Sequence, residues 1–147
     1  MKKIINSPVS VVHELCEGMI KAYPQLLSWD QENNVLYRCE LNKSKVTLIS
    51  GGGSGHEPAH GGFVGKGMLD AAVCGEVFSS PSIMQIYNAI RITASEKGVL
   101  LIIKNYAGDM MNFSGAADMA SEDDGIAVEK VCVNDDVAIQ KNDIRRG

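Results

Sequence analysis

Three side chains of this sequence could together move a proton and hold an oxygen-rich ligand: His56, Lys104 and Asp109. His56 closes the glycine-rich segment 50–56, which directly follows an apolar run. Lys104 and Asp109 lie in a short polar segment that follows a second apolar run. A carboxylate or an imidazole takes a proton from a reacting hydroxyl, and an ammonium offsets the negative charge that develops. These residue types indicate a site for acid–base chemistry on a small polar molecule.

The glycine-rich segment offers backbone groups to the same site. Glycine lets the chain turn sharply and bring its N–H groups against a ligand, and in parallel α/β folds ligands bind outside the carboxyl ends of strands. We therefore expect a substrate-binding set of Gly53, Ser54, Gly55, His56, Lys104 and Asp109, with His56 and Asp109 also catalytic. Each charged member has an ordinary structural alternative, since a lysine at a strand end is often solvated and an aspartate before a helix is often its N-cap.

Three well-known motifs are similar to this segment, and each lacks an essential residue. A P-loop requires a lysine and a hydroxyl residue after its last glycine, and neither follows here. A dinucleotide fingerprint starting at Gly51 would need its third glycine at position 56, where the chain has His56. A nucleophile elbow starting at Gly52 would need a glycine at the same position. None of the three motifs is complete.

Residues 56–60 (HEPAH) match the zinc-protease pattern H-E-x-x-H by their letters. The pattern binds zinc only where one continuous helix places both histidines on one face. Glycines precede His56, Pro58 lies between the histidines and two glycines follow His60, so we expect no such helix and no metal. A zinc hydrolase remains one alternative. His60 is explained equally well by capping or packing beside the glycines as by a functional role.

The spacing of apolar residues predicts alternating helices and strands. Helices are expected from Ser7 and Pro8 to a stop at Pro24, from Ser80 and Pro81 through Ala94, over 110–119 and, loosened by glycines, around 63–68. Strands are expected at 46–49, 71–78, 99–103 and 128–133, with 35–37 a short strand in an otherwise irregular segment 25–45. The acidic run 122–124 is expected to be a solvated turn. The alternation predicts an α/β fold with a mostly parallel sheet flanked by helices.

The composition indicates a soluble cytoplasmic protein. With 147 residues, 45% of them hydrophobic, the chain can bury a core. Its formal net charge of −4 argues against nucleic acid or an anionic membrane as the main partner. No apolar run reaches the length of a membrane span. The four cysteines form no C-x-x-C pair, so we expect free thiols in a reducing compartment.

Four segments that keep their order along the chain resemble the dihydroxyacetone kinase family: 48–58 (LISGGGSGHEP), 75–81 (GEVFSSP), 100–109 (LLIIKNYAGD) and 134–138 (NDDVA). Residues 1–6 are similar to the start of its substrate-binding K subunit in bacteria. The resemblance implies a homodimer that binds dihydroxyacetone and presents it for phosphoryl transfer. In the family, the residues matching Gly53 to His56, Lys104 and Asp109 line the substrate site, and those matching His56 and Asp109 are the acid–base groups.

The resemblance also implies a division of labour between subunits. The phosphoryl donor, ADP or ATP with Mg²⁺, is expected on a nucleotide-binding L-type subunit or domain, recharged in bacterial systems by a phosphoprotein of the phosphotransferase system, with no cofactor on this chain. A further histidine that holds the substrate carbonyl covalently is expected in a second region. Residues 1–147 are therefore expected to be the amino-terminal domain of a larger subunit, poorly active alone. A paralogue that senses dihydroxyacetone and binds a transcription regulator is the non-enzymatic alternative.

Overall fold

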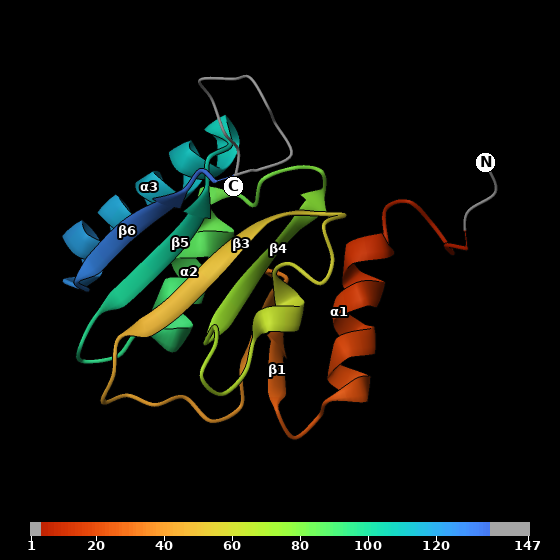
Figure 1. Cartoon of the computed structure of the whole chain (residues 1–147), viewed down its shortest axis with the longest axis horizontal. Helices are drawn as coiled ribbons and strands as arrows, with labels where there is room; N and C mark the ends of the chain where they lie inside the picture. Colours follow the sequence, from red (N-terminus) through yellow and green to blue (C-terminus); the bar gives the residue numbers. More distant parts are fainter. Residues whose placement is uncertain (1–3, 136–147) are drawn as a thin grey trace.

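The computed structural model describes residues 4–135, which form one six-stranded sheet with helices on both faces (Figure 1). The strand order is β1-β2-β4-β3-β5-β6. In chain order the elements are α1 (Val11–Ala22), β1 (Leu27–Asp30), β2 (Val35–Arg38), β3 (Thr47–Ser54), the 3₁₀ helix η1 (Gly61–Phe63), β4 (Ala71–Val77), α2 (Ile83–Thr93), β5 (Val99–Lys104), α3 (Ala107–Asp124) and β6 (Val128–Val133).

The sheet is mixed, and its larger, parallel part corresponds to the predicted α/β fold. Strands β4, β3, β5 and β6 are parallel, whereas β1 pairs with β2 and β2 with β4 in antiparallel fashion. The α/β prediction is confirmed, and so is the short strand at β2. The prediction that the rest of segment 25–45 is irregular is wrong for β1. This strand has only four residues and takes its order from pairing with β2 rather than from a pattern of its own.

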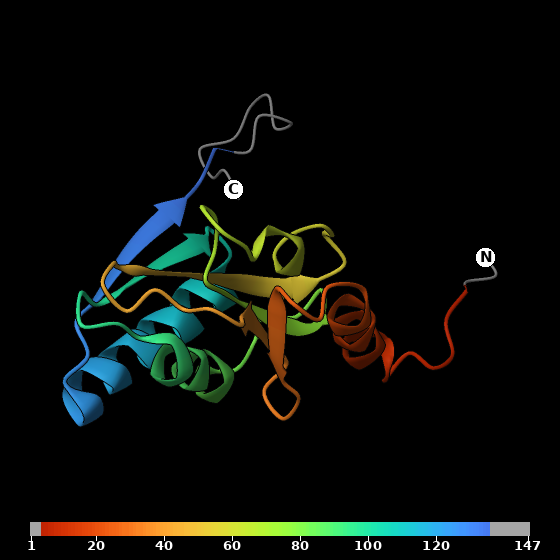
Figure 2. The same cartoon turned by 90° about the horizontal axis from the view of Figure 1, so that it is seen from below.

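Helices α2 and α3 cover one face of the sheet (Figure 2). Side chains alternate along a strand, so Ile49 of β3 and Leu101 and Ile103 of β5 point to this face and are fully buried with Phe113 of α3. On the opposite face α1 covers β2 and β4, where Cys16 packs against Leu36 and Cys74. The alternation of side chains thus separates a buried hydrophobic core under α2 and α3 from a second face of the sheet, which α1 covers only in part.

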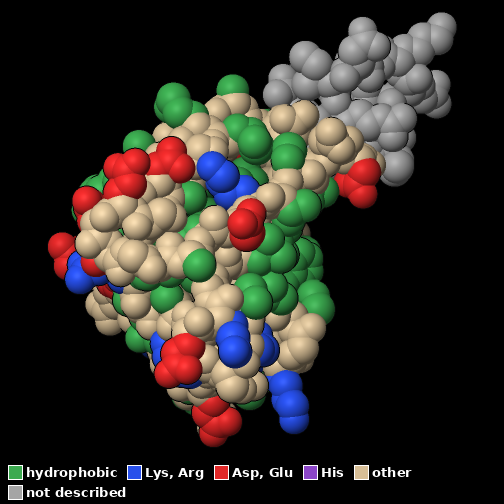
Figure 3. Space-filling model, turned by 90° about the vertical axis from the view of Figure 1, so that its left-hand side faces the viewer, with side chains coloured by type: hydrophobic (Ala, Val, Ile, Leu, Met, Phe, Trp, Pro, Cys, Tyr) green, Lys and Arg blue, Asp and Glu red, His purple; other side chains and the backbone are tan. Residues whose placement is uncertain are grey.

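The second face is open over β5 and β6. Among the described residues no helix lies there, and η1 with its flanking turns is the nearest cover (Figure 2). Leu100 and Ile102 of β5 and Val131 and Val133 of β6 lie at alternating positions on this side, with Ile102 paired to Val131, which is 44% exposed. Viewed from the β6 side, hydrophobic side chains gather here (Figure 3). The candidate site lies at the carboxyl end of this same face.

The helix boundaries differ from the sequence predictions because other residues provide the caps. Helix α1 begins at Val11 after Ser10, not at Pro8. Helix α2 begins at Ile83 because Ser82 and Gln85 form a capping box, in which the Ser82 hydroxyl accepts from the Gln85 N–H and the Gln85 amide oxygen accepts from the Ser82 N–H.

Two further helix predictions need correction. Helix α3 runs from Ala107 to Asp124 and is longer than predicted at both ends, so the acidic run 122–124 is its exposed last turn rather than a loop. Glycine at position 125, with φ 65°, ends it. The helix expected around 63–68 is limited to η1. The chain end near 144–147 lies outside the described residues.

Strand β3 is also longer than predicted, because its glycines continue the strand instead of ending it. Gly51 and Gly53 pair in parallel with Val73 and Gly75 of β4. A Cβ on Gly51 would lie 2.5 Å from the carbonyl oxygen of Val73, closer than real contacts allow. The glycines therefore permit the close approach of two strands, and the loop begins only after β3 ends.

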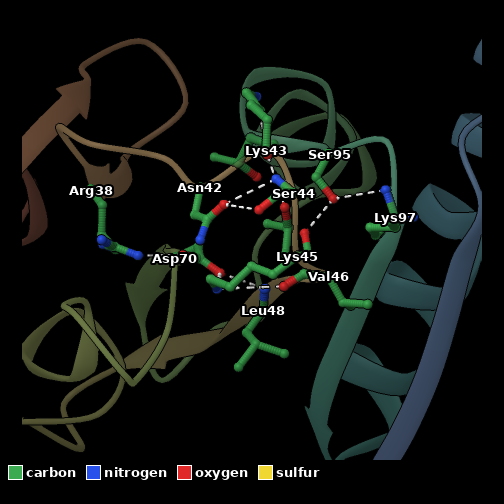
Figure 4. Close-up of polar contacts among 12 residues, drawn as sticks. Arg38, Asn42, Lys43, Ser44, Lys45, Val46, Leu48, Asp70, Ser95 and Lys97 are labelled. Carbon is green, nitrogen blue, oxygen red and sulfur yellow. Dashed lines mark hydrogen bonds and ion pairs between the residues drawn. The ribbon is translucent and has the colours of Figure 1, made fainter.

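A buried carboxylate fixes the amino ends of β3 and β4 (Figure 4). Asp70 is 2% exposed and contacts Arg38 at 2.9 Å and Lys45 at 2.5 Å. Its Oδ2 also accepts the N–H of Leu48 at 3.0 Å, and its own N–H donates to the Leu48 carbonyl. Burial acts to raise the pKa of Asp70, but the hydrogen bonds from Lys45, Leu48 and Arg38 together lower it below its ordinary value.

The described cysteines and helices bear on two predictions made from composition. Cys16, Cys39, Cys74 and Cys132 are all free thiols, as expected, with the first and third buried. No helix among residues 4–135 combines the length and apolar character that crossing a bilayer would require.

Replacing Asp70 with asparagine is expected to lower the free energy of unfolding by about 2 kcal/mol, because two cations and an N–H lose their anionic partner. Urea denaturation at neutral pH measures the change. Glu17→Gln is the control, since Glu17 pairs with Lys21 on the exposed surface and its substitution should change stability far less. Equal effects of both substitutions would contradict a structural role for Asp70.

Candidate functional site

The site is built on the bare backbone of Gly52 in β3. A Cβ on this glycine would lie 3.3 Å from Nζ of Lys104 and 3.4 Å from Oδ2 of Asp109. Lys104 is the last residue of β5, the parallel neighbour of β3, and Asp109 lies in the first turn of α3. The two parallel strands therefore end side by side, and their carboxyl ends bring a cation and an anion to the same glycine.

A cavity of about 240 Å³ opens at this point. Four residues of the predicted site line it, namely Gly53, His56, Lys104 and Asp109, and Phe78, Ser80 and Tyr106 complete the wall. The cavity is large enough for a molecule of a few heavy atoms and has charged groups of both signs. The structure thus brings together residues from the two segments that were grouped from the sequence, and adds a third segment through Phe78 and Ser80.

Asp109 is the buried acid of the site. It is the third residue of α3, where the positive end of the helix dipole favours a carboxylate, and Tyr106 rather than Asp109 is the N-cap. The residue is only 2% exposed, and its Oδ1 has no hydrogen-bond partner among the described residues. A buried acceptor without a donor is costly, so this oxygen is suited to accept a hydrogen bond from a ligand.

Lys104 is the half-buried cation of the site. Burial lowers the pKa of Lys104, and the charge of Asp109 partly offsets this. Within residues 4–135 its ammonium makes no hydrogen bond and no ion pair; its Nζ lies 5.3 Å from the ring centre of Tyr106. A partly desolvated ammonium donates strongly to a carbonyl or anionic oxygen, which gives the site its donor.

His56 stands at the exposed mouth of the cavity. Its ring meets the ring of Phe78 edge-on, with centres 5.5 Å apart, and lies 6.5 Å from that of Tyr106. Two aromatic neighbours hold the imidazole beside the cavity while leaving it accessible. An accessible imidazole near a buried carboxylate is suited to proton transfer.

Two residues of the predicted site lie outside this cavity. The hydroxyl of Ser54 is buried and donates to the carbonyl of Gly75 at 2.7 Å, so it links β3 to β4. The N–H of Gly55 donates to the carboxylate of Glu57 at 3.1 Å. Gly53 does line the cavity. The glycine segment thus contributes only Gly53 to the cavity lining, and not a row of N–H groups directed at a ligand.

The sequence analysis missed the part of the wall that comes from segment 78–80. Ser80 packs against α3, where a Cβ on Gly108 would lie 2.7 Å from its hydroxyl. Asn112 of α3 donates to the carbonyl of Pro81 at 2.8 Å and holds the segment in place. Segment 78–80 directly follows β4, the other parallel neighbour of β3. Because ligands bind at the carboxyl ends of parallel strands, this position in the sequence could have identified the segment as part of the site.

Segment 56–60 does not form the helix that the zinc pattern requires, because it is a turn followed by η1. Among the described residues no group of three or more His, Cys, Asp or Glu side chains is arranged to hold a metal. His60 instead contacts the Ser50 hydroxyl through Nδ1 at 2.9 Å. Burial, and then the charges of Lys104 and His56, lower the pKa of His60 to about 4.

The fold and the site together define an α/β domain with a small polar cavity at the carboxyl ends of parallel strands. The Dak1 domain matches residues 17–147. The chain therefore belongs to the Dak1 domain family.

Two bacterial relatives are similar to this chain over nearly all of its length. The chain is 49% identical to the PTS-dependent dihydroxyacetone kinase 1, dihydroxyacetone-binding subunit DhaK, of Listeria innocua, over 100% of this chain and 44% of that protein. It is 43% identical to the PEP-dependent dihydroxyacetone kinase, dihydroxyacetone-binding subunit DhaK, of Escherichia coli, over 95% of this chain and 39% of that protein. The chain thus spans less than half the length of these relatives.

Solved structures show the same fold. The dihydroxyacetone kinase of C. freundii superimposes with a TM-score of 0.91 at 45% identity, over 99% of this chain and 28% of that one. The dihydroxyacetone kinase operon co-activator Dha-DhaQ gives a TM-score of 0.84 at 43% identity, over 91% of this chain and 42% of that one.

The low pKa of His60 predicts a pH dependence of stability. Between pH 6.5 and about 4 the unfolded chain binds a proton at His60 that the folded chain does not bind. The free energy of unfolding should therefore fall as the pH drops through this window, by roughly 3 kcal/mol. Urea denaturation of the wild type and of His60→Asn across this pH range measures the free energy of unfolding of each protein. The difference between the two pH profiles gives the contribution of His60. Parallel pH profiles would show that His60 titrates normally in the folded chain.

Proposed function

We propose that this chain binds dihydroxyacetone at the Lys104–Asp109 site and presents it for phosphoryl transfer to give dihydroxyacetone phosphate. The observation that carries the proposal is the meeting, at Gly52, of a half-buried ammonium and a buried carboxylate whose Oδ1 has no hydrogen-bond partner among residues 4–135. Relatives named as dihydroxyacetone-binding subunits of a kinase support it. The chain would then act as the acceptor half of an alcohol phosphotransferase.

The chemistry follows from the charges around the cavity. The ammonium of Lys104 donates to the ligand's carbonyl oxygen, and the carboxylate of Asp109 accepts from a hydroxyl. As the phosphoryl group reaches that hydroxyl, its proton passes to Asp109, with His56 as the accessible acid–base group at the mouth. Phosphoryl transfer depends mainly on positioning and electrostatics, and a small polyol offers little apolar surface, so these polar contacts must supply the specificity.

The donor is proposed to come from outside this chain. The segment that resembles a P-loop lacks the lysine and hydroxyl residue that hold nucleotide phosphates. ADP or ATP with Mg²⁺ is therefore assigned to a nucleotide-binding L-type subunit or domain, and in a phosphotransferase-linked system a phosphoprotein would recharge this nucleotide. A homodimer in the cytoplasm is part of the same proposal. Relatives named as PTS-dependent subunits support the phosphotransferase link.

The structural likeness to an operon co-activator supports a second candidate function. In that role the same cavity would bind dihydroxyacetone without phosphoryl transfer, and the bound state would be read by a transcription regulator. Formation of dihydroxyacetone phosphate after addition of a nucleotide-binding subunit and its donor favours the kinase role. Binding of dihydroxyacetone without turnover favours the co-activator role.

Titration of the ¹⁵N-labelled chain with dihydroxyacetone, followed by NMR, tests the binding step. Saturable shifts are expected at Gly53, His56 and Asp109. Asp109→Asn should weaken binding at least about tenfold, because the ligand hydroxyl loses a charge-assisted acceptor. His56→Ala should leave the fold intact and weaken binding, activity or both.

Two controls make this titration specific. Asp118→Asn alters an exposed carboxylate on the same helix, 3.8 Å from Lys130, and should leave the affinity unchanged. Glycerol, which lacks the carbonyl that Lys104 would hold, should bind more weakly than dihydroxyacetone. An absence of saturable shifts in the wild type, or equal affinity of wild type and Asp109→Asn, would contradict the proposed site.

A further inference from the structure

His60 lies on the same face of β3 as the candidate site. Ser50 and Gly52 are two residues apart in the strand, so both positions face the same side of the sheet. His60 contacts the hydroxyl at the first position, and Lys104 and Asp109 lie against the second. His60 and Lys104 also share a cavity of about 360 Å³ that adjoins the site through Lys104.

The hydrogen bonds of Ser50 determine which nitrogen of His60 carries the proton. The Ser50 hydroxyl has one hydrogen, and it donates this hydrogen to the carbonyl of Ile102 at 2.7 Å. The same hydroxyl can then only accept from His60, so Nδ1 carries the proton and donates at 2.9 Å. In the neutral ring the other nitrogen, Nε2, is an acceptor. It is buried and has no partner among the described residues.

The site therefore contains three groups whose hydrogen-bonding capacity is unused within residues 4–135. Oδ1 of Asp109 and Nε2 of His60 are acceptors, and Nζ of Lys104 is the donor. Asp109 and Lys104 line the first cavity, and Lys104 and His60 line the adjoining one. A ligand that matches this order has a carbonyl flanked by two hydroxyls. Dihydroxyacetone has this arrangement, and glycerol, with a hydroxyl in the centre, does not.

We propose that Nε2 of His60 accepts a hydrogen bond from the second hydroxyl of dihydroxyacetone, while the first hydroxyl lies at Asp109 and the carbonyl oxygen faces Lys104. This assignment rests on the proposed function and adds a residue that recognises the second hydroxyl of the ligand. Since Nε2 is covered in the free protein, a neighbouring side chain must move on binding. Lys104 has a long flexible side chain and lines both cavities, so it can provide this movement.

Two substitutions separate this role from a structural one. Asparagine at position 60 places an amide N–H where Nδ1 donates to Ser50 but offers no acceptor at the position of Nε2. Glutamine places its carbonyl oxygen near that position but loses the donor to Ser50. His60→Asn should therefore weaken dihydroxyacetone binding about tenfold, and His60→Gln should recover part of the loss. A structural role predicts the reverse order.

Calorimetric titration of the chain with hydroxyacetone provides a second comparison. This ligand has the carbonyl but only one hydroxyl. Its hydroxyl should take the charged acceptor Asp109, so His60→Asn should leave its affinity unchanged. His13→Asn, on the exposed side of α1, is the matched control and should change neither affinity. Equal weakening of both ligands by His60→Asn, or weakening of neither, would overturn the inference.

Long-range ¹H–¹⁵N NMR of the histidine rings provides a readout that needs no ligand. The free chain should show His60 neutral with the proton on Nδ1 at pH 7, and a proton on Nε2 would overturn the inference directly. A wild type that binds neither ligand contradicts the proposed function and this inference with it, whereas normal wild-type binding with an unchanged preference in His60→Asn contradicts the inference alone.

Discussion

The absence of side chains along the carboxyl end of β3 is the constraint on which the rest of the structure depends. A Cβ on Gly51 would lie 2.5 Å from the Val73 carbonyl of β4, and one on Gly53 would lie 2.6 Å from the backbone nitrogen of Ser79. Real Cβ atoms do not approach so closely. Without these glycines β4 and the segment after it would have to move away from β3. The cavity wall would then move with them, because that segment carries Phe78 and Ser80.

The two ends of the sheet serve different purposes. At the amino ends of β3 and β4, Asp70 satisfies two cations and a backbone N–H, so its hydrogen-bonding capacity is used within the fold. At the carboxyl ends, Asp109 and Lys104 are brought together with capacity unused among the described residues. Both carboxylates are 2% exposed. The contrast distinguishes a buried charge that stabilises the fold from one that is available to a ligand.

The sequence predicted the elements whose order comes from their own apolar pattern, such as β5 and α2, and it predicted that Lys104 and Asp109 would meet at strand ends. It failed where partners decide the structure. Strand β1 exists through pairing with β2, and the glycines of β3 are strand residues because β4 lies so close. The buried bond of Ser54 to Gly75 could not be seen in the sequence either, since it depends on the register of two strands.

The central claim is that a small ketone with flanking hydroxyls binds above Gly52, between the Lys104 ammonium and the Asp109 carboxylate. A crystal structure of the chain soaked with dihydroxyacetone tests this most directly. The account predicts ligand density over Gly52, with the carbonyl oxygen within hydrogen-bond distance of Lys104 Nζ and a hydroxyl within hydrogen-bond distance of Asp109. Ligand density at another surface, or an unoccupied site at a saturating concentration, would contradict it.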